Sequence, residues 1–164
     1  MVEFWSFPLE CSAELEAAAE NLVSAGERDR ASRFRFARHR RRFLVRRAMR
    51  RIILADCLRT PLSKLSIREE AYGRPVIPEA PRDFSFNTSH SGECGVVAVA
   101  TGPGRLGIDV EDSRREMNYR QFADRKFTPA ESTEINRHSD DTLARVFFNC
   151  WTAKEAYIKA LGEG

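Results

Sequence analysis

Strands are the first elements that the order of apolar and polar residues predicts. Segment 84–91 alternates between the two kinds of residue and breaks at Gly92, as expected of a strand with one buried face. Segment 106–111 places leucine, isoleucine and valine on one face and glycine, aspartate and glutamate on the other. Further strands are expected over 2–7, which Pro8 ends, over 65–69 and over 95–100.

Apolar residues at helical spacing predict the helices. The longest run is 38–58, in which arginines fill the faces that the apolar stripe leaves free. Ser12 is an expected N-cap of a helix over 14–24, with Gly26 as its stop. The apolar positions of the long run are Phe43, Leu44, Ala48, Ile52, Ala55 and Leu58.

Another helix start is predicted at Thr128, which is followed by proline at the first helical position and by an acid that closes a capping box, Glu131. The remaining expected elements are a short helix or ordered turn over 27–36, a turn at 72–75, a helix over 119–126, a polar loop over 137–141 and a last helix that Leu143 leads into.

The last helix carries the pattern that is richest in candidate chemistry. One face is apolar, and the opposite face combines a tryptophan, a glutamate and two lysines. Such a face suits a metal ion and a phosphate, but it equally suits a solvated surface with one Glu–Lys ion pair. The apolar face is Cys150, Ala153, Ala156, Tyr157 and Ala160, and the opposite face is Trp151, Lys154, Glu155, Ile158 and Lys159.

The chain stops at Gly164, shortly after this helix. The pattern suggests either a truncated piece or a domain whose following strands are missing from this sequence. Residues 1–164 alone are then expected to leave the apolar face of the helix exposed, and to aggregate or to unfold with poor cooperativity.

Composition places the chain among globular proteins of about one domain. It has 164 residues, 42% of them hydrophobic and 31% charged, and no apolar run approaches a membrane span. No signal peptide is expected, because the first residues have neither a basic stretch nor a long apolar run. The four cysteines lie far apart without a CxxC motif, which argues against zinc and favours free, mostly buried thiols in a reducing cytoplasm. They are Cys11, Cys57, Cys94 and Cys150.

The net charge of +3 is unevenly distributed along the chain. Segment 28–51 contains twelve arginines, and such a patch favours a phosphate, an acidic protein or nucleic acid as its partner. The arginines are Arg28, Arg30, Arg33, Arg35, Arg38, Arg40, Arg41, Arg42, Arg46, Arg47, Arg50 and Arg51.

Asp109 and Glu111 stand two residues apart on a predicted strand, so they share one face with their Cβ atoms about 7 Å apart. Carboxylate ligands of this kind suit Mg²⁺, which takes its remaining ligands from water and substrate phosphates. The pair alone is a weak signal, because most such pairs are solvated surface. Together with Glu155 it becomes a possible site of three carboxylates.

His90 lies in the run Ser89-His90-Ser91-Gly92, where it could touch a ligand or simply bond to the backbone at a strand end. The chain has no GxSxG elbow, no Walker A motif and no GxGxxG motif. A hydrolase triad and an ordinary nucleotide-binding loop are therefore not indicated.

Taken together and in this order, the motifs resemble the signature of the 4′-phosphopantetheinyl transferases, more closely the longer, Sfp-type branch that modifies peptide and fatty-acid synthase carrier proteins. The likeness extends over roughly residues 27–163. The motifs are Asn87-x-Ser89-His90-Ser91-Gly92, Gly107-Ile-Asp109-Val-Glu111, Phe127-x-x-x-Glu131 and Trp151-x-x-Lys154-Glu155-Ala-Tyr-x-Lys159-Ala, with Arg33-Phe34 and Tyr72-Gly73-Arg74-Pro75 as further points of likeness.

The resemblance implies an enzyme that transfers the 4′-phosphopantetheine group of coenzyme A to a serine of an acyl or peptidyl carrier protein and releases 3′,5′-ADP. Fatty-acid, polyketide or nonribosomal peptide biosynthesis would be its setting, and a cytoplasmic monomer without a membrane partner is expected. The implied fold is α+β, with two similar α/β halves related by pseudo-two-fold symmetry. Here they would be 1–104, the coenzyme A-binding half, and 105–164, an incomplete second half with the metal site.

Site residues follow from the same resemblance. Mg²⁺ would be held by Asp109, Glu111 and Glu155, while Lys159 would stabilise charge at the transferring phosphoryl group. Either Glu155 or a metal-bound water would take the serine proton. The phosphates of coenzyme A would be held by Arg30, Arg51, Arg74 and His90, with Ser89 beside them.

Two departures from the family pattern stand out. Several family members have lysine where this chain has Arg30 and Arg74, and arginine also binds phosphate, often with two hydrogen bonds. Asp112 stands where a lysine often follows the carboxylate pair, which puts a cation role there in doubt.

Two alternatives stay open at this point. A basic nucleic-acid-binding module could use the arginines of segment 28–51, but no nucleic-acid motif accompanies them and few aromatic residues interleave with them. A non-catalytic scaffold could keep the fold, although the three carboxylates argue against it.

Overall fold

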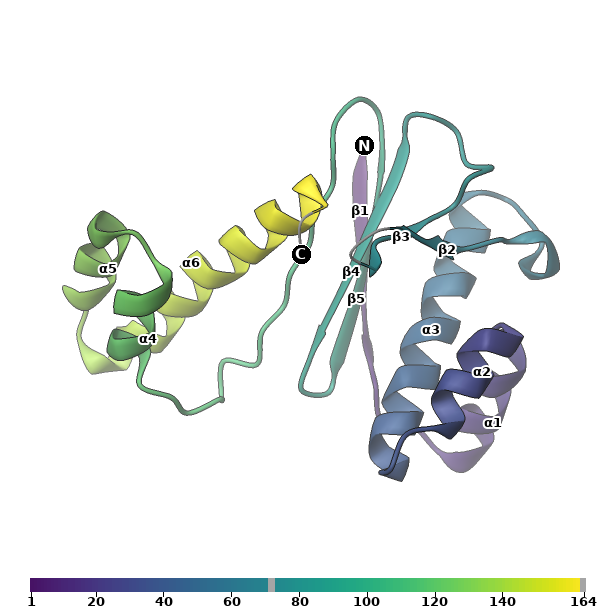
Figure 1. The fold of residues 1–164 in the computed structure, drawn as a ribbon, viewed down its shortest axis with the longest axis horizontal. Coiled ribbons are helices and arrows are strands. Elements are labelled where there is room, and N and C mark those ends of the chain that lie inside the picture. The colour runs from purple at the N-terminus through teal and green to yellow at the C-terminus, as the bar shows by residue number, and fades with distance from the viewer. Residues whose placement is uncertain (71–72, 163–164) are drawn as a thin grey trace.

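The computed structural model describes residues 1–70 and 73–162, and within them it combines antiparallel strands with α-helices (Figure 1). The α+β class expected from the sequence is confirmed. In chain order the elements are β1 (Val2–Pro8), α1 (Ala13–Leu22), α2 (Ala25–Ser32), α3 (Ala37–Cys57), a 3₁₀ turn (Leu62–Lys64), β2 (Arg68–Glu69), β3 (Pro75–Val76), β4 (Phe84–Ser91), β5 (Cys94–Thr101), α4 (Tyr119–Lys126), α5 (Pro129–Asn136) and α6 (Asp140–Leu161).

Strands β1, β5 and β4 form an antiparallel sheet in that order. The central strand β5 is buried on both faces, which explains why its sequence is a continuous apolar run rather than an alternating one. Gly92 turns the chain between β4 and β5 with a positive φ of 56°, a conformation that favours glycine. Strands β2 and β3 form a separate short pair.

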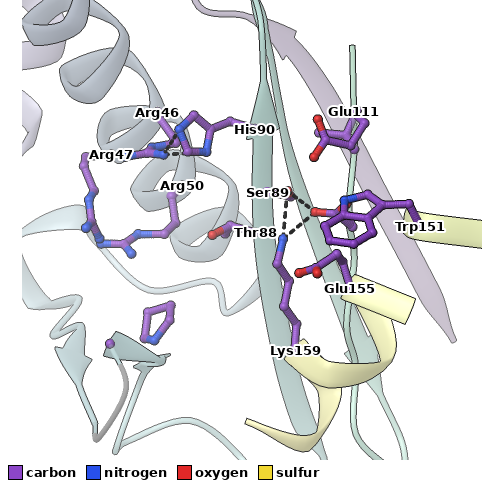
Figure 2. Close-up of a pocket in the computed structure, with 14 residues that line it drawn as sticks. Arg46, Arg47, Arg50, Thr88, Ser89, His90, Glu111, Trp151, Glu155 and Lys159 are labelled. Atoms are coloured by element: carbon purple, nitrogen blue, oxygen red, sulfur yellow. Dashed lines mark hydrogen bonds and ion pairs between the residues drawn. The ribbon is translucent and has the colours of Figure 1, made fainter. Parts of the chain in front are cut away.

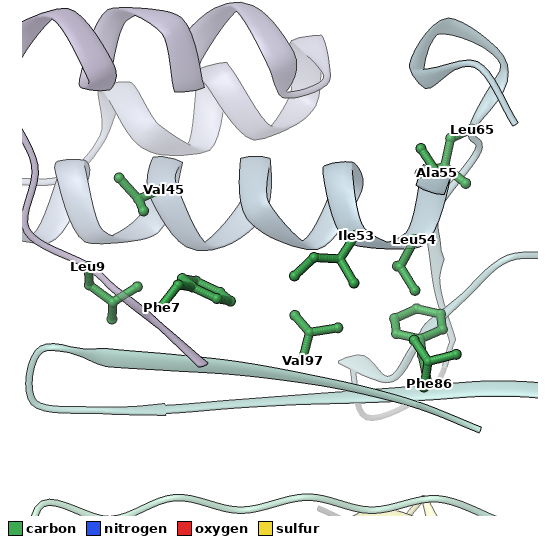
Figure 3. Packing of buried hydrophobic residues seen from close by; sticks show 10 residues of the cluster. Phe7, Leu9, Val45, Ile53, Leu54, Ala55, Leu65, Phe86 and Val97 are labelled. Atoms are coloured by element: carbon green, nitrogen blue, oxygen red, sulfur yellow. The ribbon is translucent and has the colours of Figure 1, made fainter. Parts of the chain in front are cut away.

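Helix α3 covers one face of this sheet and forms the main apolar core with it (Figure 3). Leu54 and Val97 are fully buried at this contact, and Phe7 and Phe86 reach it from the two outer strands. Truncating a buried leucine in such a core typically costs about 2–5 kcal/mol. This packing fixes the position of α3, and therefore of its arginines, relative to β4.

Helices α1 and α2 pack on the side of α3 that faces away from the sheet (Figure 1). Three consecutive arginines of α3 form ion pairs with glutamates at and before α1: Arg40 with Glu16 and Glu20, Arg41 with Glu10 and Glu16, and Arg42 with Glu10. These three of the twelve arginines of the basic segment are thus paired with carboxylates within the protein.

Helices α4, α5 and α6 form a second, aromatic core around Phe147, which is 1% exposed. Its ring lies edge-on to Phe122 and Phe127 and is stacked with Trp151 at 6.3 Å between centroids. These contacts hold the first half of α6, while its last turns reach toward the sheet (Figure 1).

The predicted strand 106–111 is not a strand in the structure. The segment runs alongside β4, with its residues 108, 109 and 111 bonded to the side chains of Asn87, Ser89 and Ser91, so side chains and not a backbone ladder hold it in place. It also passes very close to α6: a Cβ on Gly107 would lie 1.8 Å from the carbonyl oxygen of Ala156. One alternating set, Gly107, Asp109 and Glu111, supplies contacts with both β4 and α6.

Several of the predicted helices and strands are confirmed, and others need correction. The strand over 2–7, the N-cap at Ser12, the helix over 119–126 and the capping box at Thr128 agree with the structure. Gly26 does not end the first helix; it lies inside α2, because Ser24 and Glu27 form a second capping box there. Further corrections are that α6, at 22 residues, is longer than α3, at 21; that strand 65–69 is reduced to 68–69; and that Ile52 is 38% exposed. The polar loop predicted over 137–141 is also shorter, because α6 already begins at Asp140.

The face of α6 that was expected to be apolar is partly exposed, since Tyr157 is 67% exposed. The opposite face, with Trp151, Glu155 and Lys159, turns toward the protein. Tyr72 of the predicted turn lies outside the described residues, whereas Gly73 has the positive φ of 76° that such a turn needs. The four cysteines are free and half-buried, not mostly buried.

Two further expectations concern larger features. The pseudo-two-fold relation between the halves stays a prediction. None of the helices within the described ranges combines the length and the hydrophobicity of a membrane span.

Candidate active site

A cavity of about 440 Å³ lies between helix α3, strand β4, the segment 109–111 and helix α6 (Figure 2). Basic and acidic side chains line it from opposite sides. Its lining residues are Arg46, Arg47 and Arg50 of α3; Thr88, Ser89 and His90 of β4; Asp109, Val110 and Glu111; Trp151, Glu155 and Lys159 of α6; and Gly73 and Pro75.

Alternate residues of β4 hold the acidic segment against the sheet. The Asn87 side-chain oxygen accepts a hydrogen bond from the Ile108 amide at 3.3 Å. The Ser89 hydroxyl donates to Asp109 at 2.7 Å, and the Ser91 hydroxyl donates to Glu111 at 2.8 Å. Because side chains two apart on a strand share a face, this spacing on β4 matches the two-residue spacing of the carboxylates.

Gly107 brings α6 to the same place. A side chain here would begin with a Cβ only 1.8 Å from the Ala156 carbonyl oxygen, so there is no room for one. Helix α6 therefore lies against the acidic segment, and Glu155 and Lys159 on its inner face enter the cavity (Figure 2). In the sequence, this glycine reads as one polar position in an alternating pattern.

Lys159 and Asp109 form a tight, largely buried ion pair. The Lys159 Nζ atom lies 2.5 Å from Asp109 Oδ1 and 2.9 Å from the Ser89 hydroxyl oxygen. The Asp109 side chain is only 6% exposed, and its second oxygen, Oδ2, has no hydrogen-bond partner among the described residues. A buried carboxylate oxygen without a partner is costly, so it favours a cation or donor there.

Three arginines of α3 form the basic wall. Arg46 and Arg50 are one helical turn apart, with Arg47 beside them. Desolvation, together with the charge of Arg47, lowers the pKa of Arg46 and of Arg50 from 12.5 to about 10. Glu27 is bonded to Arg50 at 2.9 Å and only partly offsets this crowding. Cations held together in this way favour binding of an anion.

His90 faces this wall. Arg46 Nη1 lies 2.6 Å from its Nδ1 atom and 2.5 Å from its Nε2 atom, and because arginine only donates, these contacts favour a neutral ring with one accepting nitrogen. The residue keeps an exposed edge. Partial shielding from water, the charges of Arg46, Lys159 and Arg47, and a smaller opposing effect of Asp109 lower the pKa of His90 from 6.5 to about 4.

The cavity brings together six of the residues singled out in the sequence: Ser89, His90, Asp109, Glu111, Glu155 and Lys159. The structure does not bring Arg30, Arg51 and Arg74 into its lining. Arg51 donates to the carbonyls of Leu62 and Leu65, both at 3.2 Å, and Arg30 lies over the Phe43 ring. Arg74 lines an adjoining cavity of about 180 Å³ that shares Thr88 and Lys159.

The sequence reasoning missed the arginines that form the basic wall. Arg46, Arg47 and Arg50 have the spacing i, i+1 and i+4, which places them on one side of a helix. That signal is present in the sequence, but in a run of twelve arginines it does not stand out. Arg51, one residue further, points to the 3₁₀ turn instead.

Lys154 also differs from its predicted role beside the metal and phosphate. Its ammonium lies 2.6 Å from Glu131, which also caps the start of α5. The hydrogen bonds from Lys154 and Thr128 lower the pKa of Glu131 to about 2. These two motif residues join α6 to α5 and do not line the cavity.

The three predicted metal ligands share one cavity, but they do not converge. Among residues 1–70 and 73–162, no three acidic, histidine or cysteine side chains come together at the spacing of a metal site. Asp109 is paired with Lys159 and Glu111 with Ser91. The chemistry of the set fits Mg²⁺, because all three ligands are carboxylates and Asp109 Oδ2 is unpartnered within the described residues.

Comparison with known proteins gives two family matches that together span nearly the whole chain. Residues 9–102 match the model of the 4′-phosphopantetheinyl transferase N-terminal region, and residues 105–164 match that of the 4′-phosphopantetheinyl transferase superfamily.

Individual relatives of the chain are also named phosphopantetheinyl transferases. The chain is 35% identical to 4′-phosphopantetheinyl transferase HetI of a Nostoc species over 99% of this chain and 69% of the relative. It is 34% identical to a 4′-phosphopantetheinyl transferase of Bacillus subtilis over 87% of this chain and 66% of the relative. It is 30% identical to the human L-aminoadipate-semialdehyde dehydrogenase-phosphopantetheinyl transferase over 98% of this chain and 56% of the relative.

The chain thus spans between 56% and 69% of the length of these three relatives. The matches cover both the basic wall, in the first region, and the acidic wall, in the second. On these matches, the chain belongs to the 4′-phosphopantetheinyl transferase superfamily.

Proposed function

We propose that this protein transfers the 4′-phosphopantetheine group of coenzyme A to a serine of an acyl or peptidyl carrier protein, in a Mg²⁺-dependent reaction that releases 3′,5′-ADP. The observation that carries the proposal is the cavity with arginines on one wall and carboxylates with a lysine on the other. Coenzyme A has a phosphate-rich half that suits the first wall and a reacting pyrophosphate that suits the second.

On the basic wall, Arg46, Arg47 and Arg50 are proposed to bind phosphate groups, with neutral His90 able to take up a proton beside them. This replaces Arg51 and Arg30 as the principal phosphate ligands, since both point elsewhere. Arg74 keeps a proposed role from the adjoining cavity. Ser89 keeps its proposed place beside the phosphates. Its hydrogen bonds with Asp109 and Lys159 hold it in the cavity.

On the acidic wall, Asp109, Glu111 and Glu155 are proposed to hold Mg²⁺, which would neutralise charge on the pyrophosphate when bound. Lys159 would stabilise charge that develops at the transferring phosphoryl group. Glu155 is proposed to accept the proton of the carrier serine. Ser89 and Ser91 fix the orientation of the first two carboxylates through their hydrogen bonds.

A nucleic-acid-binding module has less support. Arg40, Arg41 and Arg42 are engaged by glutamates, which leaves fewer free cations for a phosphate backbone. The arginines that do converge face a cavity with carboxylates opposite, and a nucleic-acid backbone would meet that negative charge.

Further parts of the proposal concern setting and architecture. We infer a monomer acting in the cytoplasm on carrier proteins of fatty-acid, polyketide or peptide synthesis. Residues 1–104 would supply the coenzyme A-binding half, and 105–164 would begin the second half. The two walls of the cavity follow this division, with α3 and β4 on one side and the acidic segment and α6 on the other.

The test is mass spectrometry of an apo carrier protein incubated with this protein, Mg²⁺ and coenzyme A. A gain of one phosphopantetheine group is expected, and no gain with any of several acyl and peptidyl carriers would contradict the proposal. Binding of coenzyme A and of a DNA duplex at equal salt separates the two functions, because only the first ligand is expected to bind tightly.

A further inference from the structure

Lys159 is in an unusual position for a residue that should act on a substrate phosphate. Its ammonium is already engaged, at 2.5 Å from Asp109 Oδ1 and 2.9 Å from the Ser89 hydroxyl (Figure 2). Its side chain is 25% exposed, and that of Asp109 is 6% exposed. Ion pairs shielded from water in this way are screened far less than surface pairs.

The pair also lies where the proposed cation would bind. Asp109 is a deeply buried carboxylate of the proposed set, and its Oδ1 atom already accepts two hydrogen bonds, from Lys159 and Ser89. Glu155 sits one turn before Lys159 on α6, so both reach the cavity from the same helix face. The lysine thus supplies the positive charge that a buried Asp109 requires.

We propose that Lys159 is the resident counter-ion of Asp109 in the ligand-free protein, and that it competes with the divalent cation until a phosphate-bearing ligand draws it away. This rests on the proposed function for the identity of the cation and the phosphates. When both ligands bind, Asp109 pairs with the cation and Lys159 with the ligand's phosphate. Each ligand removes the competitor of the other, so the two bind with positive cooperativity.

Binding of the cation alone, without catalysis, separates this competition from the reaction. Replacing Lys159 with methionine keeps the length of the side chain and removes the competing charge. We expect Lys159→Met to bind Mn²⁺ alone about 10- to 150-fold more tightly, the range that release of one charge-assisted hydrogen bond implies. The measurement is electron paramagnetic resonance of free Mn²⁺ during titration of the protein without coenzyme A.

A matched control removes a different positive charge from the same cavity. Arg46 lines the cavity but contacts His90, not Asp109. Arg46→Met should therefore change Mn²⁺ affinity by much less than Lys159→Met, and Lys159→Arg, which keeps the charge, should stay close to the wild type. Thermal melts of all variants check that each is folded.

Cooperativity provides the second readout. Mn²⁺ should tighten coenzyme A binding in the wild type. The ratio of the coenzyme A affinity with Mn²⁺ to that without Mn²⁺ should be several-fold smaller in Lys159→Met. If Lys159→Met and Arg46→Met tighten Mn²⁺ equally, the effect is general electrostatics and the proposal is wrong; unchanged Mn²⁺ affinity in a folded Lys159→Met protein also overturns it. Transfer to an apo carrier is measured separately, with the wild type. If Lys159→Met binds Mn²⁺ more tightly but the wild type transfers nothing, only the proposed function is overturned.

Discussion

The two walls of the cavity are built in different ways. The basic wall consists of neighbouring residues of one helix, whose relative positions follow from helical geometry alone. The acidic wall joins positions far apart in the chain: Ser89 is 20 residues from Asp109, and Asp109 is 50 from Lys159. Local geometry makes the first wall robust, whereas the second depends on the contact between two separately packed parts.

That difference has a consequence for mutation. A change in the basic wall should remove one charge and leave the others in place. A change in the contact that joins the acidic segment to α6 should displace several groups at once, even where no polar atom is altered.

The largest effect is expected for Asp109→Ala. In the proposed reaction this carboxylate holds the cation that neutralises the pyrophosphate, so transfer to an apo carrier should fall by several orders of magnitude. Its removal also leaves Lys159 without its counter-ion. We therefore expect a lower melting temperature for the ligand-free protein as well, and loss of the stabilisation by Mg²⁺ with coenzyme A.

The melting temperature of the ligand-free variant distinguishes an ion pair from simple repulsion. If the three carboxylates only repelled one another, removing Asp109 would leave the ligand-free protein unchanged or more stable. A melt of Asp109→Ala at or above the wild-type temperature would support repulsion and contradict the ion pair.

A large effect is also expected for Gly107→Ala, although it adds a single methyl group. The new Cβ would meet the Ala156 carbonyl at 1.8 Å, so α6 or the acidic segment must move. Overpacking of this kind typically costs about 1–3 kcal/mol of stability. We expect transfer to drop by about 100-fold, since misplacement by about 1 Å can cost that much. Gly26→Ala, where the added Cβ meets no atom within 4 Å, is the matched control.

A moderate effect is expected for Arg46→Met in the basic wall. Loss of one charged hydrogen bond to a phosphate should weaken coenzyme A binding by about 1.5–3 kcal/mol, or roughly 10- to 150-fold. Arg38→Met on the same helix should change binding little, because Arg38 is exposed and does not line the cavity. Calorimetric titration with coenzyme A measures the affinity of both variants. An equal loss of affinity in Arg46→Met and Arg38→Met would indicate only a general charge effect.

The smallest effect is expected from the protonation of His90. Its pKa of about 4 lies below the 6.5 of the unfolded chain, so the unfolded state binds the extra proton between these values. Stability from this group is therefore lost as pH falls from about 6.5 to about 4. A bound phosphate should raise the pKa again, so coenzyme A binding near pH 6 should take up protons.

Calorimetry in two buffers of different ionisation enthalpy measures that proton uptake. Uptake should disappear in His90→Gln, whose affinity for coenzyme A should fall by about 1–3 kcal/mol. Affinity for dephospho-coenzyme A should fall much less if His90 contacts the 3′-phosphate. Uptake that persists in the variant would assign the proton to another group.

The contrast between the walls also explains what the sequence could predict. Local signals worked: neighbouring residues predict the caps at Ser12 and Thr128, the alternating strand β4 and the long helix α3. Signals that depend on distant partners did not. Segment 106–111 alternates like a strand, yet its partners are β4 side chains and the backbone of α6.

For the site, the ordered motifs identified the residues that meet across the acidic wall. They did not identify the basic wall, because Arg46 and Arg51 look alike in a run of arginines and differ only in which part of the fold they face. Nor could they show that Lys154 would pair with Glu131 while Lys159 pairs with Asp109.

Both walls are proposed to act on one bound molecule of coenzyme A, with its cation between the carboxylates. Anomalous diffraction from crystals of the protein grown with Mn²⁺ and coenzyme A tests this most directly. We predict a single Mn²⁺ peak bonded to Asp109, Glu111 and Glu155, with the pyrophosphate beside it and another phosphate on Arg46, Arg47 or Arg50. A Mn²⁺ peak away from these carboxylates, or coenzyme A bound outside the cavity, would contradict it.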